Sequence, residues 1–458
     1  MRERHSGSLV NHSAWNPGSE EVGATPGVHR GPVRRAGGWP APAGLAAVLL
    51  APHAAWASER LSAGDTAWVL TSTALVLLMV PGLALFYGGM VRSKNVLSTL
   101  MLSFIAMGAI GIQWVAAGYS LSFGGTGGPL LGGLDRLFLA GIGPDHLTGT
   151  IPTLAFVAFQ GMFAIITPAL ISGAVVERVR FGAYTLFIVL WAFLVYDPLA
   201  HWVWGDGGWL LELGALDFAG GTVVHISSGV SALAAVLVLG KRKGYPTEPF
   251  IPHNLTMTLL GAGLLWFGWF GFNAGSALAA NGTAVLAFLS TNTAAAAGMV
   301  GWLLAERVRF GKPSALGAAS GLVAGLVAIT PGAGFITPGW AVVVGGVAGV
   351  VCFAAVCLKG RFGYDDALDV LGVHGVGGAW GALATGMFAT VGAGSLLTGD
   401  VRQFGVQVVG VVAAAAYAFG VTWVLCKGID AAVGLRVDEA DEVTGLDQAA
   451  HGEVGYSL

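Results

Sequence analysis

The chain has 458 residues, of which 55% are hydrophobic and only 10% are Asp, Glu, Lys or Arg. Soluble domains carry roughly a quarter charged residues, so this composition excludes an ordinary water-soluble protein. A formal net charge of -3 leaves no basic field for nucleic acid and too little repulsion for a disordered chain. The sequence therefore predicts an integral membrane protein with no nucleic-acid partner.

The first 57 residues are interpreted as a presequence. Arg34 and Arg35 precede an apolar run over residues 43–51, and the small-x-small pattern of a signal-peptidase site follows at residues 55–57. We predict a cleaved signal peptide within 1–57. The alternative is a twelfth, anchoring helix, although the run is shorter than the ~20 residues that a span needs.

From Thr66 onward, apolar segments of spanning length follow one another with short turns between them. We predict eleven transmembrane helices. Their limits are 66–89, 97–122, 151–175, 182–203, 219–240, 254–274, 283–305, 314–330, 337–358, 367–389 and 403–427. The expected organisation is an all-α membrane domain over 58–428 followed by a tail over 429–458.

Loop charges test this count independently, because short cytoplasmic loops retain Lys and Arg. Outside the presequence, only Arg60, Arg136 and Arg402 fall on one side of the predicted membrane domain. Fourteen basic residues fall on the other side: Arg92, Lys94, Arg178, Arg180, Lys241, Arg242, Lys243, Arg307, Arg309, Lys312, Lys359, Arg361, Lys427 and Arg436. The split predicts a multi-pass protein of the inner (plasma) membrane, with the mature N-terminus outside and the C-terminal tail in the cytoplasm.

Two histidines lie well inside predicted spans, His225 in the fifth and His374 in the tenth, whereas the other eight lie in tails, in loops or at span ends. Each follows an aspartate by eight residues, Asp217 and Asp366 respectively. Ionisable side chains inside a membrane are costly and therefore mark candidate functional sites. The matched positions predict that the first ten helices form two inverted five-helix repeats with a substrate path between them. The alternative is that each histidine only hydrogen-bonds a neighbouring helix.

Aromatic residues gather near the predicted external mouth. Trp204 ends the fourth span, and Phe159 and Phe163 are four residues apart on one face of the third. Such rings suit a small cation, at roughly 0.5 to 2 kcal/mol per contact, although ordinary packing is the alternative. Asp197 is expected near this mouth, either raising the local cation concentration or as a hydrated loop charge. Pro168 is expected to kink the third span and to shift its aromatic face.

Metal and disulfide chemistry find no support in the sequence. Cys352, Cys357 and Cys426 lie in apolar runs without a CxxC pair or a histidine at ligand spacing. We predict no metal site, no cofactor and no disulfide.

Four motifs are more specific. They are PGLALFYGG at 81–89, AFQGMF at 158–163, GALDFAGGTVVH at 214–225 and GWFGFNAGS at 268–276. With a tail pattern over 434–453, they make the chain resemble the ammonium transporter (Amt/Mep/Rh) family, bacterial Amt type, from about residue 62 to 457. The resemblance implies a homotrimer with one narrow pore in each subunit, and a transporter with no catalytic residues.

The resemblance also implies roles for particular residues. Trp204, Phe163 and Ser276 are the implied external recruitment site for ammonium, and Phe163 and Phe272 the stacked gate beneath it. The implied pore interior holds the twin histidines and a lining: His225, His374, Leu83, Tyr87, Leu170, Trp269 and Val370. Asp217 is the implied buried structural and electrostatic residue. The tail is implied to lie near the binding site of a cytoplasmic PII (GlnK-type) signalling protein.

The expected mechanism is recruitment of NH4+, loss of its proton, and conduction of NH3 with return of the proton. Three other functions stay open. The first is an ammonium sensor with little net flux. The second is an intramembrane enzyme that uses the two histidines as acid and base, although no HExxH, Walker or nucleophile pattern accompanies them. The third is a pore for water, urea or protons.

Overall fold

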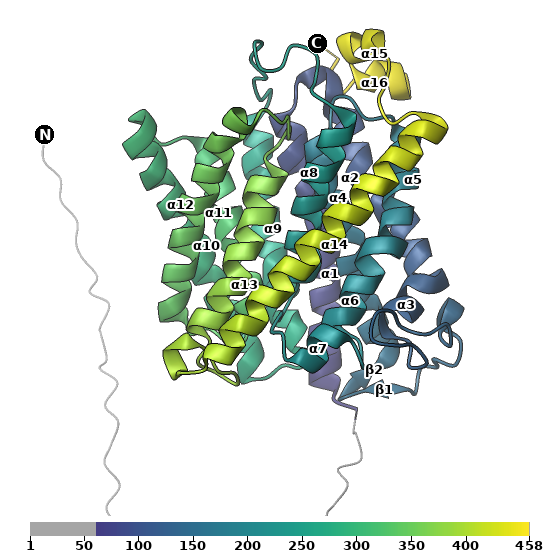
Figure 1. The fold of residues 1–458 in the computed structure, drawn as a ribbon, viewed down its shortest axis with the longest axis vertical. Helices are drawn as coiled ribbons and strands as arrows, with labels where there is room; N and C mark the ends of the chain where they lie inside the picture. The colour runs from purple at the N-terminus through teal and green to yellow at the C-terminus, as the bar shows by residue number, and fades with distance from the viewer. Residues whose placement is uncertain (1–60, 458) are drawn as a thin grey trace, which may run out of the picture. The chain divides into compact units, whose positions relative to one another are not determined.

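The computed structural model describes residues 61–457, so the predicted presequence lies outside the described residues. Within that range eleven long helical segments form one bundle (Figure 1). Ten of them are long and apolar enough to cross a membrane, and the segment over 371–388 completes the set. This agrees with the eleven predicted helices of an all-α membrane protein.

The first five spanning segments include three that contain short π-helical turns. They are α1 (Ala63–Met90); η1 (Ser93–Asn95), α2 (Val96–Gln113), η2 (Trp114–Gly118) and α3 (Tyr119–Phe123); α4 (Thr153–Val175); α5 (Phe181–Trp191), η4 (Ala192–Tyr196), α6 (Asp197–Trp204) and α7 (Trp209–Leu213); and η5 (Gly221–Ile226) with α8 (Ser227–Leu239). The π-helical turns are η2, η4 and η5.

The other six segments follow without a long interruption. They are α9 (Leu255–Ala274) with η6 (Gly275–Ala277); α10 (Gly282–Phe310); α11 (Ala315–Ile329) with η7 (Thr330–Gly332); α12 (Pro338–Phe362); the π-helical turn η8 (Leu371–Gly375) with α13 (Val376–Phe388); and α14 (Val401–Val433). Short elements complete the described chain: η3 (Leu137–Leu139), β1 (Leu147–Thr148), β2 (Ile151–Pro152), η9 (Leu396–Thr398), α15 (Glu439–Thr444) and α16 (Leu446–His451).

Local sequence explains where several helices begin and end. The side chains of Ser62, Asn254, Asn281, Ser314 and Asp400 each accept a hydrogen bond from a backbone N–H in the first helical turn. At the other end, α10 and α12 run past their predicted limits until a glycine takes the left-handed conformation. The extra turns are rich in Lys, Arg and Glu, which are good helix formers but end an apolar window.

The bundle has two ends, which we name by the tail. The tail face holds α15, α16 and residues 91–95, 176–180, 240–254, 311–314 and 363–370, and the opposite face holds β1, β2 and α7 (Figure 1). Between them α1 packs against α9, and η5 and α8 pack against η8 and α13. The first and sixth segments, and the fifth and tenth, therefore meet as two five-helix repeats require. The long α14 crosses the outside of the bundle diagonally over α8 and α13.

Candidate transport pathway

His225 and His374 are buried, and each lies in a π-helical turn that begins after an aspartate. The Asp217 carboxylate accepts four backbone N–H bonds of 2.6–3.1 Å from residues 220–223, which open η5. Asp366 accepts one bond of 2.8 Å from the N–H of Leu371, the first residue of η8. Because helix-terminal N–H groups lack helical partners, each aspartate fixes the start of the turn that carries a histidine.

His225 and His374 contact each other in the middle of the bundle. Their Nδ1 atoms are 3.3 Å apart, and their rings lie 5.3 Å apart at an interplanar angle of 25°. One Nδ1 must donate and the other accept, so the contact fits two neutral imidazoles in different tautomers. The Nε2 of His225 is buried and has no hydrogen-bond partner among residues 61–457. An unpaired nitrogen is therefore available to a polar guest.

Glycine allows the two histidine helices to approach this closely. A Cβ atom at Gly229 would collide with the backbone of Gly375, and one at Gly378 would lie 2.9 Å from the Cβ of His225. Side chains at these positions would separate α8 from η8 and α13. The histidine contact therefore depends on small residues at the helix crossing.

The paired imidazoles line an apolar internal cavity. Its lining consists of Met79, Leu83, Phe86, Ile166, Leu170, Val224, His225, Leu265, Trp269, Phe272, Val323 and His374. Leu83, Leu170 and Trp269, to which the resemblance assigns a pore-lining role, are among these residues, and the role itself stays a prediction. Two others are buried elsewhere: Tyr87 donates its hydroxyl hydrogen to the Leu170 carbonyl at 3.1 Å, and Val370 precedes η8. Which side chains line the cavity depends on how each helix is rotated about its own axis, and sequence spacing alone does not give that rotation.

Two phenylalanine rings separate this cavity from a second one at the opposite face. Phe163 and Phe272 lie 4.3 Å apart between ring centroids, and each side chain is 1% exposed. Phe272 lines the internal cavity and lies 6.0 Å from the ring of His225, whereas Phe163 lines the outer pocket. The two rings are tilted at 34° to each other and lie between the two cavities.

The outer pocket brings together the three residues of the implied recruitment site. It has an empty volume of about 590 Å³. Its lining consists of Phe123, Phe156, Gln160, Phe163, Val203, Trp204, Leu211, Phe218, Ser276 and Leu278. The Trp204 indole donates to the backbone carbonyl of Asp217 at 2.8 Å, which fixes its ring 6.1 Å from that of Phe163. The Asp217 carboxylate is meanwhile occupied by backbone N–H groups.

The hydroxyl of Ser276 is set up as an acceptor toward this pocket. It donates its hydrogen to the Phe272 carbonyl at 2.8 Å, so its lone pairs remain for an N–H donor. Sequence reasoning missed Gln160 and Phe218 in the lining. Gln160 carried a usable signal, because a polar residue three positions before Phe163 shares its helical face.

One expectation about this end of the molecule is wrong. Asp197 is fully buried as the first residue of α6, so it is neither a hydrated loop charge nor a charge exposed at the mouth. The reason is that its carboxylate faces Gln113 of α2 inside the bundle. The kink at Pro168 stays a prediction: α4 runs through this residue from Thr153 to Val175.

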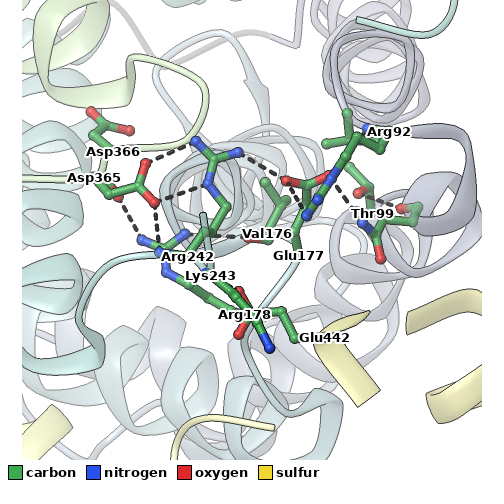
Figure 2. A network of polar contacts seen from close by, with 12 residues as sticks. Arg92, Thr99, Val176, Glu177, Arg178, Arg242, Lys243, Asp365, Asp366 and Glu442 are labelled. Carbon is green, nitrogen blue, oxygen red and sulfur yellow. Dashed lines mark hydrogen bonds and ion pairs between the residues drawn. The ribbon is translucent and has the colours of Figure 1, made fainter. Parts of the chain in front are cut away.

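A buried ion network lies at the tail face (Figure 2). Arg242 donates 2.9 Å and 2.8 Å bonds to Glu177 and Asp365, and Arg92 pairs with Glu177 at 3.0 Å. Burial by itself raises the pKa of Glu177, but the hydrogen bond from Arg92 and the charge of Arg242 outweigh it and hold the pKa below its usual value. Arg178 is buried beside them and donates to three backbone carbonyls. In the sequence, Arg92, Arg178 and Arg242 served only as loop charges that indicate membrane topology, and their pairing with Glu177 and Asp365 was not predicted.

The tail is attached to this network and to the start of α2. The Asp447 carboxylate accepts from the N–H groups of Leu97 and Ser98 at 3.0 Å and 2.8 Å. Arg436 pairs with buried Glu442 at 2.7 Å. Further contacts run from Lys94 to the backbone of α15 and from Lys243 to Glu439. A carboxylate at a helix N-terminus is favoured by the helix dipole, so the tail is docked on the bundle.

A bundle of membrane-spanning helices around an apolar internal cavity is the architecture of a membrane transporter. Comparisons with known proteins specify it further. The sequence model described as the Ammonium Transporter Family matches residues 67–456. The chain belongs to this family.

Relatives and solved structures agree with this assignment. An ammonium transporter of Bacillus subtilis is 54% identical over 86% of this chain and 98% of its own length. The ammonium transporter Amt1 of Archaeoglobus fulgidus is 47% identical over 87% of this chain and all of its own. The crystal structure of Candida albicans Mep2 matches with a TM-score of 0.79 and 37% identity, covering 84% of this chain and 88% of that one. A structure described as a sensor Amt protein matches with a TM-score of 0.79 and 31% identity, covering 85% and 98%.

Proposed function

We propose that this protein recruits NH4+ at Trp204, Phe163 and Ser276, removes its proton at the phenyl gate, and conducts NH3 past His225 and His374. The proton returns along the two histidines, so that the net movement is that of ammonium. The observation that carries the proposal is the contact of two imidazoles inside an apolar cavity directly beneath a closed aromatic gate.

Recruitment follows from the chemistry of the outer pocket. The faces of Trp204 and Phe163 attract a cation, at about 0.5–2 kcal/mol per contact. The Ser276 oxygen accepts an N–H bond, which NH4+ can donate and K+ cannot. Two ions of equal charge are therefore distinguished by hydrogen bonding.

Deprotonation follows from the cost of the next step. Moving a small ion from water into a medium as apolar as the internal cavity carries an idealised cost on the order of 20 kcal/mol. Neutral ammonia avoids most of that cost, and the His225 and His374 nitrogens replace part of its lost hydrogen bonding. The lining beyond the histidines favours a neutral guest, which makes proton removal the selective step.

We also propose the setting in which this pathway works. Basic residues concentrate on the tail face, which places that face in the cytoplasm and the outer pocket outside the inner membrane. Residues 1–57 serve as a cleaved signal, and residues 58–428 form the membrane domain of a homotrimer. The docked residues 429–458 act as a regulatory tail that offers a surface to a PII-type protein.

A sensor with little flux is the second candidate, because a sensor Amt protein is among the similar structures. The described tail consists of two six-residue helices, which are too small to form a signalling domain of their own.

Purified protein in liposomes separates the two candidates. The expected result is ammonium uptake well above that of protein-free liposomes, with potassium left outside at the same gradient. Binding of ammonium with no uptake above that control would contradict transport and favour the sensor.

A further inference from the structure

Asp197 and Gln113 form a buried polar contact behind the wall of the outer pocket. Gln113 is the last residue of α2, directly before the π-helical turn η2, and Asp197 follows the π-helical turn η4. Asp197 is 0% exposed and Gln113 is 4% exposed. Two polar residues are therefore enclosed where two distorted helices meet.

Hydrogen bonding leaves one oxygen of each side chain unused. The Nε2 of Gln113 donates to Oδ2 of Asp197 at 2.8 Å. Oε1 of Gln113 and Oδ1 of Asp197 are both buried and have no partner among residues 61–457. Each is an acceptor when the aspartate is ionised, so neither can satisfy the other.

A counter-charge for the carboxylate is also missing in the part of the chain that the structure describes. None of the ion pairs there includes Asp197. A buried, unpaired carboxylate is among the most costly groups in a protein interior, and such a group takes up a proton instead.

We propose that Asp197 is a proton-binding site that holds a neutral carboxylic acid, with its Oδ1–H donating to Oε1 of Gln113. Together with the observed bond from Nε2 to Oδ2, this closes a ring of two hydrogen bonds between an acid and an amide. One proton satisfies both unused oxygens and removes the buried charge. The proposal does not depend on which solute the pathway carries.

The neighbouring polar groups do not compete with Gln113 for this proton. The Asp197 backbone carbonyl, not its carboxylate, accepts from Ser122 Oγ at 3.5 Å. His201 directs its two ring nitrogens at the carbonyls of Ser122 and Gly128, at 2.9 Å and 2.8 Å. The buried Tyr196 hydroxyl has no hydrogen-bond partner among the described residues. The Asp217 carboxylate accepts its hydrogen bonds from backbone N–H groups at the start of η5.

The pair has a structural consequence for the outer pocket. It joins α2 to the first residue of α6, and Trp204 is the last residue of the same helix. A neutral pair holds these helices together without placing a negative charge in the wall behind a cation site. Asp197 is thus a positioning residue, and it is absent from the pocket lining.

Infrared difference spectroscopy on the full-length protein in liposomes tests the proposal. Wild type minus Asp197→Asn should show the carbonyl band of a protonated carboxylic acid, shifted in D2O, at neutral pH. Gln113→Leu should move that band, because it removes the amide partner but keeps the acid. A carboxylate band in place of the acid band in either difference spectrum would overturn the proposal.

Matched variants add a second test. Asp197→Asn can exchange the same two hydrogen bonds with Gln113 and should keep the wild-type melting temperature. Asp197→Leu has a side chain of similar size but leaves the Gln113 amide unpaired, so it should melt lower. Equal melting of the Asn and Leu variants would contradict the cyclic pair.

Discussion

The two ends of the bundle differ in where they place charged side chains. At the opposite face, the passage is lined by aromatic rings and a hydroxyl, and the Asp217 carboxylate beside it is occupied by backbone N–H groups. At the tail face, buried Arg242 holds Glu177 and Asp365 at 2.8–2.9 Å. Charge is thus kept out of the outer pocket and the internal cavity and used to hold loops and the tail together. Under the proposed function, a pathway without charged residues would exclude solutes that keep their charge, because it offers them no counter-charge.

Breaking the tail-face network should have the largest effect. Arg242→Leu would leave the buried Asp365 carboxylate without its ion-pair partner and Glu177 with Arg92 alone, at a cost of about 3–5 kcal/mol. We expect a marked fall in melting temperature and yield. Lys243 is exposed and pairs with exposed Glu439. Lys243→Ala is therefore the matched control and should change stability little. Equal melting of the two variants would show that the network is not structural.

Loss of the Asp217 cap should come next. Asp217→Ala removes the acceptor for four N–H groups at the start of η5, which costs about 1–3 kcal/mol where they stay unsatisfied. Transport should fall with stability, because His225 loses its support. Asp217→Asn keeps one acceptor oxygen and should lie between wild type and Ala. A fully stable and active Ala variant would contradict the capping role.

A variant in the outer pocket tests the opposite end of the bundle. Trp204→Leu removes a contact of about 0.5–2 kcal/mol with the cation, so apparent ammonium affinity should weaken about 2- to 30-fold. The melting temperature should hardly change. Trp423→Leu, on the exposed face of α14, is the control and should leave affinity unaltered. Equal affinities in both variants would remove Trp204 from the site.

Acid should weaken the tail face through Glu177, and this is the smallest effect expected near neutral pH. The folded-state pKa of Glu177 is lowered, so its ion pairs stabilise the fold fully above the usual glutamate range. That stability is lost as the pH falls through the lower, folded-state pKa. Melting temperature should therefore drop in acid more steeply for wild type than for Glu177→Gln. Parallel curves would assign the acid sensitivity to other groups.

Sequence alone could predict the parts of the molecule that depend on composition. Long apolar segments and loop charge gave the eleven spans, because insertion in a membrane is governed by hydropathy and basic residues. Two intramembrane histidines could be singled out because few ionisable residues remain there. Motif resemblance then supplied Trp204, Ser276 and Phe272.

Side-chain direction and pairing could not be predicted in the same way. Sequence spacing does not give the rotation of each helix, so Tyr87 and Val370 are absent from the cavity lining while Gln160 and Phe218 line the outer pocket. Asp197 was expected at the external mouth because it lies near the end of the predicted fourth span, and its burial depends on neighbouring helices that the sequence does not show. The Arg242 network joins loops far apart in sequence, and spacing carries no information about such pairs.

The central claim is that the passage carries a neutral molecule past two touching imidazoles. Its most direct test records current and internal pH together in liposomes that hold wild type or the double variant His225→Ala, His374→Ala. Wild type should respond to ammonium and not to potassium, and the double variant should lose this discrimination or its proton movement. Unchanged current, pH response and selectivity in the double variant would contradict the account.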